Sequence, residues 1–427
     1  MTESRFTDQT LLERIAGQVG TPFFLYDAQI LRDRIERIVD LTSSEGLQAR
    51  YAMKALSVAP VLREMKNAGL WIDAVSGNEV LRAKASGYPM GAQPPEVLLT
   101  ADAFRDNARE VLQSEAVLPN LGSPGQLGEL IEGGYRGPAG IRVNPGFGHG
   151  HVQACDTGGP SSKHGVWPDE LASLAEMADG TDVSLVLLHA HVGSGPQIEE
   201  LEANLEKLSS FFADMLSLFP DLEAVNLGGG FPHDYRDAAA IADLTGLGTL
   251  LRAARERFCA LAGRPIRVEV EPGRFLAAAC GGLVSRVTDR KQTRTNDKGE
   301  GHDFLMVDAG FCDLVRPAMY GSYHRISVVG RELGPAAPLA VAGPLCESGD
   351  LFTRDADELI ETRMLPVPRR GDFLVLHDAG AYGASMSSNY NSLGKAPQIW
   401  LDDEGPRLAQ RRETLEDILA LECDESL

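Results

Sequence analysis

Short apolar runs alternate with amphipathic stretches from about residue 23 to residue 275. Runs such as "ARYAMK", "WIDAVS" and "LVLLHAHVG" have the length and composition of buried strands. The segments between them, such as "VAPVLREMKNAG" and "IEELEANLEKLSSFFADMLSLF", repeat apolar residues every three or four positions, as helices that cover a sheet do. Repeated strand–helix units indicate an α/β fold built on a parallel (β/α)8 barrel over residues 23–275, which we expect to begin near "FFLYD".

The pattern changes after residue 276. Runs such as "GGLVSRVTDRKQ", "DFLMVDAG" and "DFLVLHDAG" are typical of antiparallel strands, and long helical patterns become scarce. We therefore expect a second domain over residues 276–427, a mostly antiparallel β-barrel or sandwich, to which residues 1–22 are joined.

Composition narrows the classes of partner. The 427 residues include 40 basic and 61 acidic side chains, a formal charge of −21, which disfavours nucleic acid and anionic membranes as partners. No apolar run reaches the roughly 18 residues of a spanning helix, and the six cysteines form no CxxC pair. These features predict a cytoplasmic protein.

Polar residues and glycines stand where the predicted strands end. The active sites of βα barrels lie at the C-terminal ends of the strands, so these residues are candidates for a functional site. They are Lys54, Asp73, Arg142, His189, His191, Gly228, Gly229, Gly230, Glu269, Glu271 and Arg274. A lysine desolvated at a barrel mouth can form a Schiff base, although a lysine that only reaches solvent explains the position of Lys54 equally well.

Two glycine-rich turns and two glutamates suggest what such a site would hold. "NLGGGFP" and "HVGSG" follow neighbouring strands, and glycines let backbone N–H groups approach a phosphate closely. Glu269 and Glu271 share one face of a strand, and a buried carboxylate needs a partner. That partner is either an arginine of a core ion pair or a protonated heterocyclic nitrogen, such as that of pyridoxal phosphate.

The two histidines of "HAHVG" leave three readings open. As metal ligands, His189 and His191 would make the chain a metal-dependent barrel hydrolase, but zinc needs further ligands, and the nearby cations Lys54 and Arg142 oppose a divalent metal. An imidazole stacked on a flat aromatic cofactor fits the neighbouring glycine turns. A satisfied core histidine is the third reading, and we expect it for His189. We predict no metal site.

Ten motifs, in order, carry a resemblance to a known family. They are "YAMKA", "DAVSGNE", "RVNPGFGHGH", "TGGPSSKHG", "HAHVGSG", "NLGGGF", "EPGRFL", "DAGFCDLVRPAMYGSYH", "GPLCESGD" and "GAYGASMSSNYNS". The chain resembles the pyridoxal-phosphate enzymes with an alanine-racemase-like barrel, and among them most closely the diaminopimelate decarboxylase family. The resemblance covers residues 23 to about 420.

The resemblance implies a pyridoxal 5'-phosphate site. Lys54 would hold the cofactor covalently as a Schiff base, His191 would stack on its ring, and Glu271 would pair with the pyridine nitrogen. Asp73 and Arg142 match positions that line the pocket. The phosphate would be held by Ser194, Gly228, Gly229, Gly230, the backbone of Gly273 and Arg274, and the hydroxyl of Tyr382.

It also implies a reaction, the decarboxylation of meso-2,6-diaminopimelate to L-lysine and carbon dioxide, the last step of lysine biosynthesis. Arg274, Arg316 and Tyr320 would bind the distal carboxylate of this amino-acid substrate, and Glu347 its distal ammonium, with Tyr382 also at the substrate. Cys346 would help protonate the carbanion. In this family the site is built at a homodimer interface, so the partner would donate Cys346 and Glu347.

Departures from the family pattern keep the substrate open. Leu56 replaces a common Asn, and Leu393-Gly394 replaces the usual Arg-Pro after "NYNS". The alternative is a decarboxylase acting on ornithine, lysine, arginine or a diaminopimelate-like intermediate of specialised metabolism; the basic amino acids, however, lack the distal carboxylate that Arg316 would bind. A racemase fits less well because "CESGD" favours decarboxylation. A non-catalytic regulator fits less well because it would be expected to lose Lys54, which is present. The loop with His149, His151 and His164 is expected to cover the site rather than to bind metal.

Overall fold

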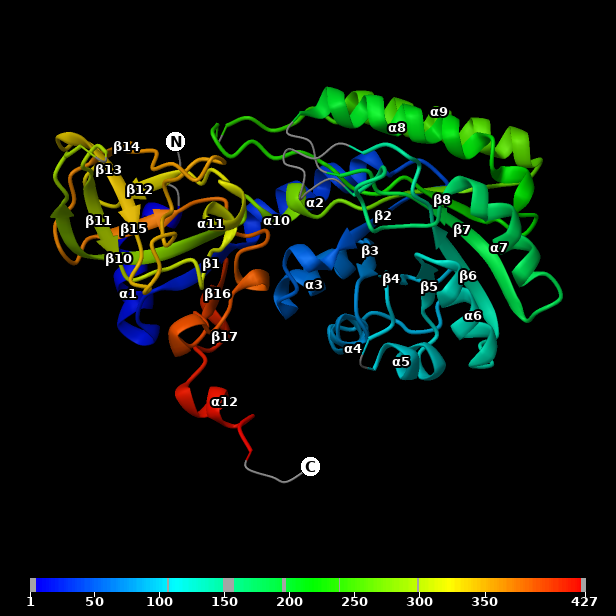
Figure 1. Ribbon diagram of the computed structural model, residues 1–427, viewed down its shortest axis with the longest axis horizontal. Helices are drawn as coiled ribbons and strands as arrows, with labels where there is room; N and C mark the ends of the chain where they lie inside the picture. The colour runs from blue at the N-terminus through cyan, green and yellow to red at the C-terminus, as the bar shows by residue number, and fades with distance from the viewer. Residues whose placement is uncertain are drawn as a thin grey trace. The chain divides into compact units, whose positions relative to one another are not determined.

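The computed structural model describes residues 5–105, 107–148, 157–193, 197–237, 239–297 and 299–423. It divides into two compact units (Figure 1). The first comprises residues 32–234 and 240–276, and the second comprises residues 1–31, 235–239 and 277–427.

The first unit is a closed barrel of eight strands in which every neighbouring pair is parallel. The predicted TIM-like barrel is therefore confirmed. Its strands follow one another around the barrel in chain order, and β2 closes the ring against β9. They are β2 (Leu47–Ala52), β3 (Trp71–Ala74), β4 (Val97–Ala101), β5 (Leu118–Leu121), β6 (Gly137–Arg142), β7 (Val183–His189), β8 (Ala224–Asn226) and β9 (Arg267–Val270).

Helices alternate with these strands. α8, for example, buries one apolar stripe with Leu201, Leu205, Leu208 and Phe212. It runs alongside α9 (Figure 1). Serine side chains cap two of them by accepting a backbone N–H bond: Ser76 on α4 and Ser123 on α6. The helices are α2 (Ala28–Leu41), α3 (Ala59–Asn67), α4 (Gly77–Ala85), α5 (Ala108–Ser114), α6 (Pro124–Glu132), α7 (Leu171–Ala178), α8 (Ile198–Ala213), α9 (Thr245–Ala262) and α10 (Arg274–Ala277).

The second unit is built on a nine-stranded, mostly antiparallel sheet with the main order β14-β13-β11-β10-β1-β16-β17, while β15 pairs with β10 and β12. Its strands are β1 (Phe23–Asp27), β10 (Gly281–Gln292), β11 (Asp303–Val307), β12 (Ile326–Val328), β13 (Ala336–Ala342), β14 (Arg363–Pro366), β15 (Phe373–Leu376), β16 (Gln398–Asp402) and β17 (Gly405–Gln410). In the described part of this unit, the accompanying α-helices are α1 (Gln9–Val19), α11 (Arg316–Tyr320) and α12 (Leu415–Leu419).

The prediction was wrong about the first strand. "FFLYD" is β1, and it belongs to the sheet of the second unit, where it pairs antiparallel with β10 and parallel with β16. All five of its residues are buried, and a strand covered on both faces looks the same in a barrel and in the middle of a packed sheet. The barrel begins instead at Leu47. Phe6, just before α1, and Leu12, within it, pack into the same core as Phe23.

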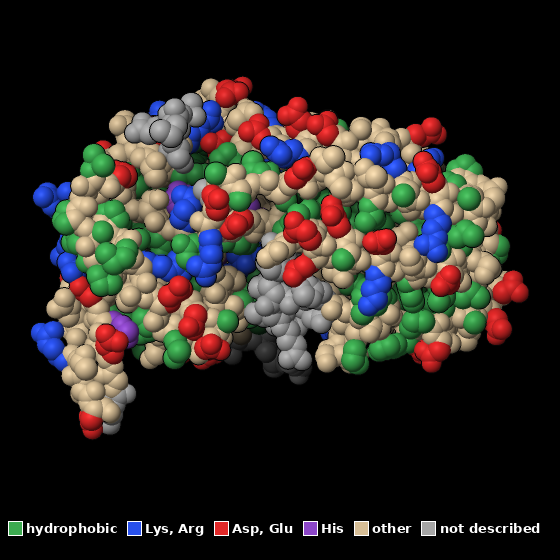
Figure 2. Space-filling view, turned by 90° about the horizontal axis from the view of Figure 1, so that it is seen from above, with side chains coloured by type: hydrophobic (Ala, Val, Ile, Leu, Met, Phe, Trp, Pro, Cys, Tyr) green, Lys and Arg blue, Asp and Glu red, His purple; other side chains and the backbone are tan. Residues whose placement is uncertain are grey.

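Acidic side chains are spread over one face of the protein. Figure 2 shows acidic side chains spread across the face that it presents, in keeping with the formal charge of −21. Within the described residues, no helix is both long enough and apolar enough to traverse a bilayer.

Candidate active site

The C-terminal ends of the barrel strands bring five predicted site residues into electrostatic contact. Lys54 lies in the 3-10 turn η2 (Met53–Ala55) directly after β2, and Asp73 lies in β3. Arg142 ends β6, His191 follows β7, and Glu271 follows β9. The charges of Lys54, Arg142 and Glu271 all act on the titration of His191, and those of Lys54 and Glu271 on that of Asp73. These five predicted residues therefore gather at the strand ends, where the active sites of βα barrels lie.

Glu271 is held as a carboxylate by two polar side chains. The imidazole Nε2 of His189 lies 3.2 Å from its Oε2, and Asn226 Nδ2 donates to its Oε1 across 2.7 Å. Burial alone would raise the pKa of Glu271, but the contact with His189 and the charge of Lys54 hold that pKa well below its usual range. The carboxylate is therefore ionised and fixed in direction.

His189 has both ring nitrogens engaged by protein side chains. Asn120 Nδ2 lies 2.9 Å from its Nδ1, and Nε2 faces Glu271. It is almost completely buried. This satisfied core position is what the sequence predicted for it, and it argues against His189 as a metal ligand. Among the described residues, no group of three or more His, Cys, Asp and Glu side chains is placed to hold a metal ion.

Glu269 takes the other kind of partner that the sequence left open. Arg50 contacts both of its oxygens, at 2.6 and 3.2 Å, and Arg267 lies 2.8 Å from Oε1. Both guanidinium groups also lie over the ring of Trp71. Burial raises the pKa of Glu269, but the two arginines outweigh that effect and lower it. The two glutamates thus share a strand face but not a role: Glu269 is the acidic partner in a core ion pair.

Asp73 is a buried carboxyl whose Oδ1 has no hydrogen-bond partner among the described residues. Burial and the charge of Glu271 raise its pKa to about 8. At neutral pH the group is therefore mostly protonated. A buried polar atom without a protein partner is the kind of atom that a bound group satisfies.

The three glycines after β8 form a cradle that no side chain could enter. A Cβ on Gly228 would lie 2.4 Å from the carbonyl oxygen of Ala190, one on Gly229 would lie 2.5 Å from that of Glu271, and one on Gly230 would lie 2.7 Å from that of Gly193. Gly228 and Gly230 also have φ values of +73° and +104°. The backbone here is consequently bare of side chains, as a phosphate-binding loop requires.

His191 lies against this cradle. The N–H of Gly229 donates to its Nδ1 across 3.2 Å. Burial, followed by the charges of Lys54 and Arg142, lowers the pKa of His191 well below its usual value. The ring is therefore neutral at physiological pH, which suits stacking on a flat aromatic group.

Arg142 contacts two residues at the barrel mouth, His164 and Asp102, and the sequence did not predict Asp102 as a site residue. Its guanidinium lies 3.2 Å from His164 Nδ1 and 3.9 Å from Asp102 Oδ1, and His164 also contacts Asp102. Burial would raise the pKa of Asp102, but His164 and Arg142 lower it. Asp102 follows β4 directly, so the strand-end rule would have found it.

The segment around residues 157–165 is tied to the same strand ends. Asn144 accepts hydrogen bonds from the N–H groups of Gly146 and Gly159, and Thr157 Oγ1 donates to the carbonyl of His191.

Asn120 and Asn226 were not predicted as site residues, because an asparagine within a strand carries no pattern that marks it. His149, His151 and Ser194 lie outside the described residues.

Other predicted residues belong to the second unit. Arg316 and Tyr320 are the first and last residues of α11, four positions apart and so on one side of the helix. Tyr382 lies after β15 with φ +60°. Cys346 and Glu347 are exposed in the loop after β13, where the N–H of Cys346 donates to Asn391 Oδ1 across 3.0 Å. Gly273 and Arg274, at the start of α10, belong to the barrel unit.

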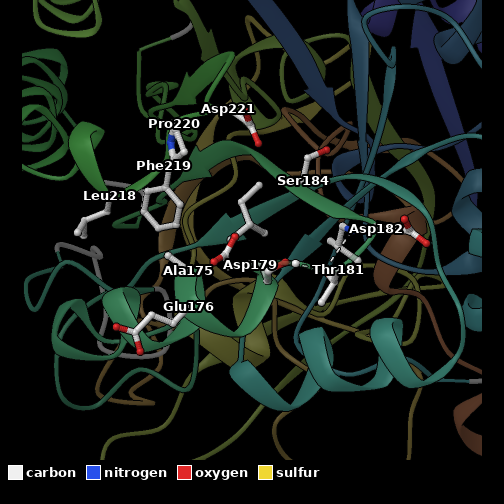
Figure 3. Close-up of a pocket in the computed structure, with 14 residues that line it drawn as sticks. Ala175, Glu176, Asp179, Thr181, Asp182, Ser184, Leu218, Phe219, Pro220 and Asp221 are labelled. Atoms are coloured by element: carbon white, nitrogen blue, oxygen red, sulfur yellow. Dashed lines mark hydrogen bonds between the residues drawn. The ribbon is translucent and has the colours of Figure 1, made fainter.

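A separate cavity of about 500 Å³ lies at the far end of β7 from this site. It is formed by the end of α7, the start of β7 and the segment around Phe219, with Glu176, Asp179, Asp182 and Asp221 among its lining residues (Figure 3). It contains none of the predicted site residues.

A parallel barrel with a strand-end lysine, an anchored carboxylate and a glycine cradle is typical of a class of pyridoxal-phosphate enzymes. The family model for the pyridoxal-binding domain of pyridoxal-dependent decarboxylases matches residues 31–278. The chain is 42% identical to the diaminopimelate decarboxylase of Escherichia coli K12, over 99% of this chain and 98% of that protein. It is 40% identical to the diaminopimelate decarboxylase of Streptomyces coelicolor, over 98% and 92% of the two chains. The chain belongs to the diaminopimelate decarboxylase family.

Solved structures agree. A crystal structure of diaminopimelate decarboxylase superposes with a TM-score of 0.88 at 40% identity, covering 96% of this chain and 95% of that one. The Helicobacter pylori diaminopimelate decarboxylase in complex with L-lysine gives a TM-score of 0.83 at 26% identity, over 96% and 98% of the two chains. The prediction of a pyridoxal-dependent amino-acid decarboxylase is confirmed by these relatives.

Proposed function

We propose that this chain decarboxylates meso-2,6-diaminopimelate to L-lysine and carbon dioxide, using pyridoxal phosphate held at the strand ends of the barrel. The observation that carries the proposal is the meeting of Lys54, the anchored carboxylate of Glu271 and the glycine cradle at those ends. Full-length similarity to diaminopimelate decarboxylases supports the choice of substrate.

The residues present fit the cofactor. The unpartnered Oδ1 of Asp73 and the bare backbone of Gly228–Gly230 are features that a bound phosphorylated ring would use. Lys54 would hold the cofactor covalently, and Glu271 would keep a proton on its ring nitrogen. The neutral ring of His191 would lie against its face, with Asp73 and Arg142 lining the pocket. Its phosphate would be held by Gly228, Gly229, Gly230, Ser194, the backbone of Gly273 and Arg274, and Tyr382.

When bound, pyridoxal phosphate supplies the sink for the electron pair released as carbon dioxide leaves. The chain supplies charge and orientation. Glu271 stays ionised because His189 and Asn226 hold it, so its negative charge is in place before the carbon–carbon bond breaks. Because burial lowers the pKa of His191 well below its usual value, its ring would add no positive charge to the cofactor face that it would cover.

We expect five of the predicted residues to select the substrate. Arg274, Arg316 and Tyr320 would bind the distal carboxylate, because guanidinium groups suit a planar anion. Glu347 would bind the distal ammonium, with Tyr382 also at the substrate. Cys346 would deliver a proton to the carbon that has lost carbon dioxide.

The active form would be a homodimer in which the partner donates Cys346 and Glu347. The exposure of both side chains in a single copy supports this. Mixing the inactive variants Lys54→Ala and Cys346→Ala tests it, because exchange of subunits would create one intact site per mixed dimer and restore activity. Mixtures that stay inactive after subunit exchange would refute shared sites. A cytoplasmic location stays a prediction.

The substrate is tested by supplying the purified protein with pyridoxal phosphate and meso-diaminopimelate and measuring lysine and carbon dioxide. Ornithine, lysine and arginine serve as comparison substrates. The proposal expects release of carbon dioxide from diaminopimelate alone. Turnover of a basic amino acid in its place would support the alternative substrate class, for which Leu393-Gly394 was the sequence signal.

A further inference from the structure

Two side chains of the second unit contact the guanidinium group of Arg316. The guanidinium Nη1 lies 3.0 Å from Nε2 of His324, and the guanidinium carbon lies 4.6 Å from the centre of the Tyr235 ring. The rings of Tyr235 and His324 in turn make an edge contact, with centroids 5.3 Å apart and planes inclined by 71°. Arg316 and His324 are both buried.

The hydrogen bonds of His324 determine where its proton lies. Nδ1 lies 2.9 Å from the carbonyl oxygen of His377, and a carbonyl can only accept, so Nδ1 carries the hydrogen. A guanidinium can only donate, so Nε2 must present its lone pair to Arg316. His324 is therefore a neutral imidazole that accepts from Arg316 on one side and donates to the backbone on the other.

We propose that His324 is a positioning residue: it aims Arg316 at the distal carboxylate of the substrate and thereby sets the preference for substrates that carry one. This inference rests on the proposed function. An arginine side chain has many rotamers, and holding its planar fork in place before the substrate arrives removes that cost from binding. A neutral acceptor does this without cancelling the positive charge that attracts the carboxylate.

Two amines provide the test, because they differ only in the distal carboxylate. L-lysine retains the carboxylate that Arg316 would bind, whereas 1,5-diaminopentane lacks it. Competitive inhibition constants for both amines are measured on the holoenzyme. The constant for 1,5-diaminopentane divided by that for L-lysine, called the ratio below, reports the contact with the carboxylate. The ratio is independent of the rate of the chemical step, so it separates positioning from a general loss of activity.

Three substitutions at His324 separate the two hydrogen bonds. In His324→Gln, the amide oxygen reaches the place of Nε2 and still accepts from Arg316. In His324→Asn, the shorter amide reaches the place of Nδ1 and keeps only the bond to the His377 carbonyl. His324→Leu keeps neither. We expect the ratio to stay within about threefold of wild type in His324→Gln and to collapse by about tenfold or more in the other two, the size of one charge-assisted hydrogen bond.

Ser327→Ala is the matched control, because Ser327 contacts the side chain of His377 at 2.8 Å and does not form part of the Arg316 contacts above. It should leave the ratio unchanged. If a His324 variant fails to fold in a thermal-unfolding assay, Tyr235→Leu replaces it: removal of the ring beneath Arg316 lowers the ratio, and Tyr235→Phe keeps it.

The reverse ranking, with Asn retaining the ratio and Gln losing it, would show that His324 only supports the backbone at His377. An unchanged ratio in all variants would also overturn the inference. Failure of the proposed function is distinguished from both, because the wild-type enzyme would then make no lysine from diaminopimelate.

Discussion

The Nε2 atom of His189 lies 3.2 Å from Oε2 of Glu271, and this contact joins the ends of two barrel strands that are far apart in the sequence. Because Asn120 meets the other ring nitrogen, His189 directs its Nε2–H at the carboxylate. His189, which the sequence predicted to be a satisfied core histidine, thus supports the carboxylate that the chemistry would need.

Replacing that carboxylate tests its role. Glu271→Gln keeps the shape but removes the charge, so it would no longer stabilise a proton on the cofactor ring. We expect kcat to fall by about 10²–10³-fold, the loss typical of a removed electrostatic contact, while the protein still binds pyridoxal phosphate. Steady-state kinetics of the holoenzyme measure it, and a kcat within a few fold of wild type would contradict the assigned role.

Glu269→Gln is the companion substitution, two residues away on the same strand face. It leaves Arg50 and Arg267 facing a neutral amide inside the core, and removing one partner of a buried ion pair costs about 3–5 kcal/mol. We expect a lower free energy of unfolding with kcat of the folded fraction near wild type. Denaturant unfolding and kinetics together check this. The opposite result, normal stability with lost turnover, would mean that the two glutamates have been assigned the wrong way round.

Glu269 and Glu271 also show which features the sequence alone could predict. The alternation in "EVEPG" placed both carboxylates on one face, but which one meets an arginine depends on Arg50, His189 and Asn226, whose strands become neighbours only when the barrel closes. The barrel, and the positions of Lys54 and the glycine cradle at its strand ends, could be predicted from the sequence. They depend on local patterns and on the rule that active sites lie at strand ends. β1 was misplaced because a doubly covered strand carries no mark of the sheet that it joins.

Asp73 predicts a pH dependence of stability in the cofactor-free protein. Its pKa is raised from 3.8 to about 8 in the folded state, so between these values the folded protein binds a proton that the unfolded chain does not. The stabilisation is fully present below about pH 4 and is lost as the pH rises through about 8. Asp73→Asn should flatten this part of the profile. Thermal unfolding of both proteins between pH 5 and pH 9 tests the sign: a wild type that grows more stable relative to the variant as pH rises would contradict it.

Gly229→Ala tests the cradle. The new methyl group would lie 2.5 Å from the carbonyl oxygen of Glu271, so the loop or the strand end must move, and we expect pyridoxal phosphate to bind about tenfold or more weakly. Gly125→Ala on α6 is the control, since the nearest atom to its Cβ is the Ser123 hydroxyl at 3.8 Å. Titration of the cofactor-free proteins gives the affinities. Equal affinities would show that the cradle does not hold the phosphate.

Gly394 explains part of the departure at Leu393-Gly394. A Cβ at this position would lie 2.0 Å from the carbonyl oxygen of Glu413, so the chain passes too close for any other residue. Gly394→Ala should therefore lower thermal stability while the preference between diaminopimelate and the basic amino acids stays unchanged. A changed preference in a stably folded variant would instead make this segment part of substrate selection.

Lys54 is the residue that we expect to hold the cofactor at the strand ends. Borohydride treatment of the holoenzyme fixes a carbonyl cofactor to the amine that carries it, and peptide mass mapping then locates the added mass. We predict the pyridoxyl group on Lys54 and its absence from that peptide in native enzyme left unreduced. A group fixed to a different lysine, or to none in a protein that binds the cofactor, would contradict the account.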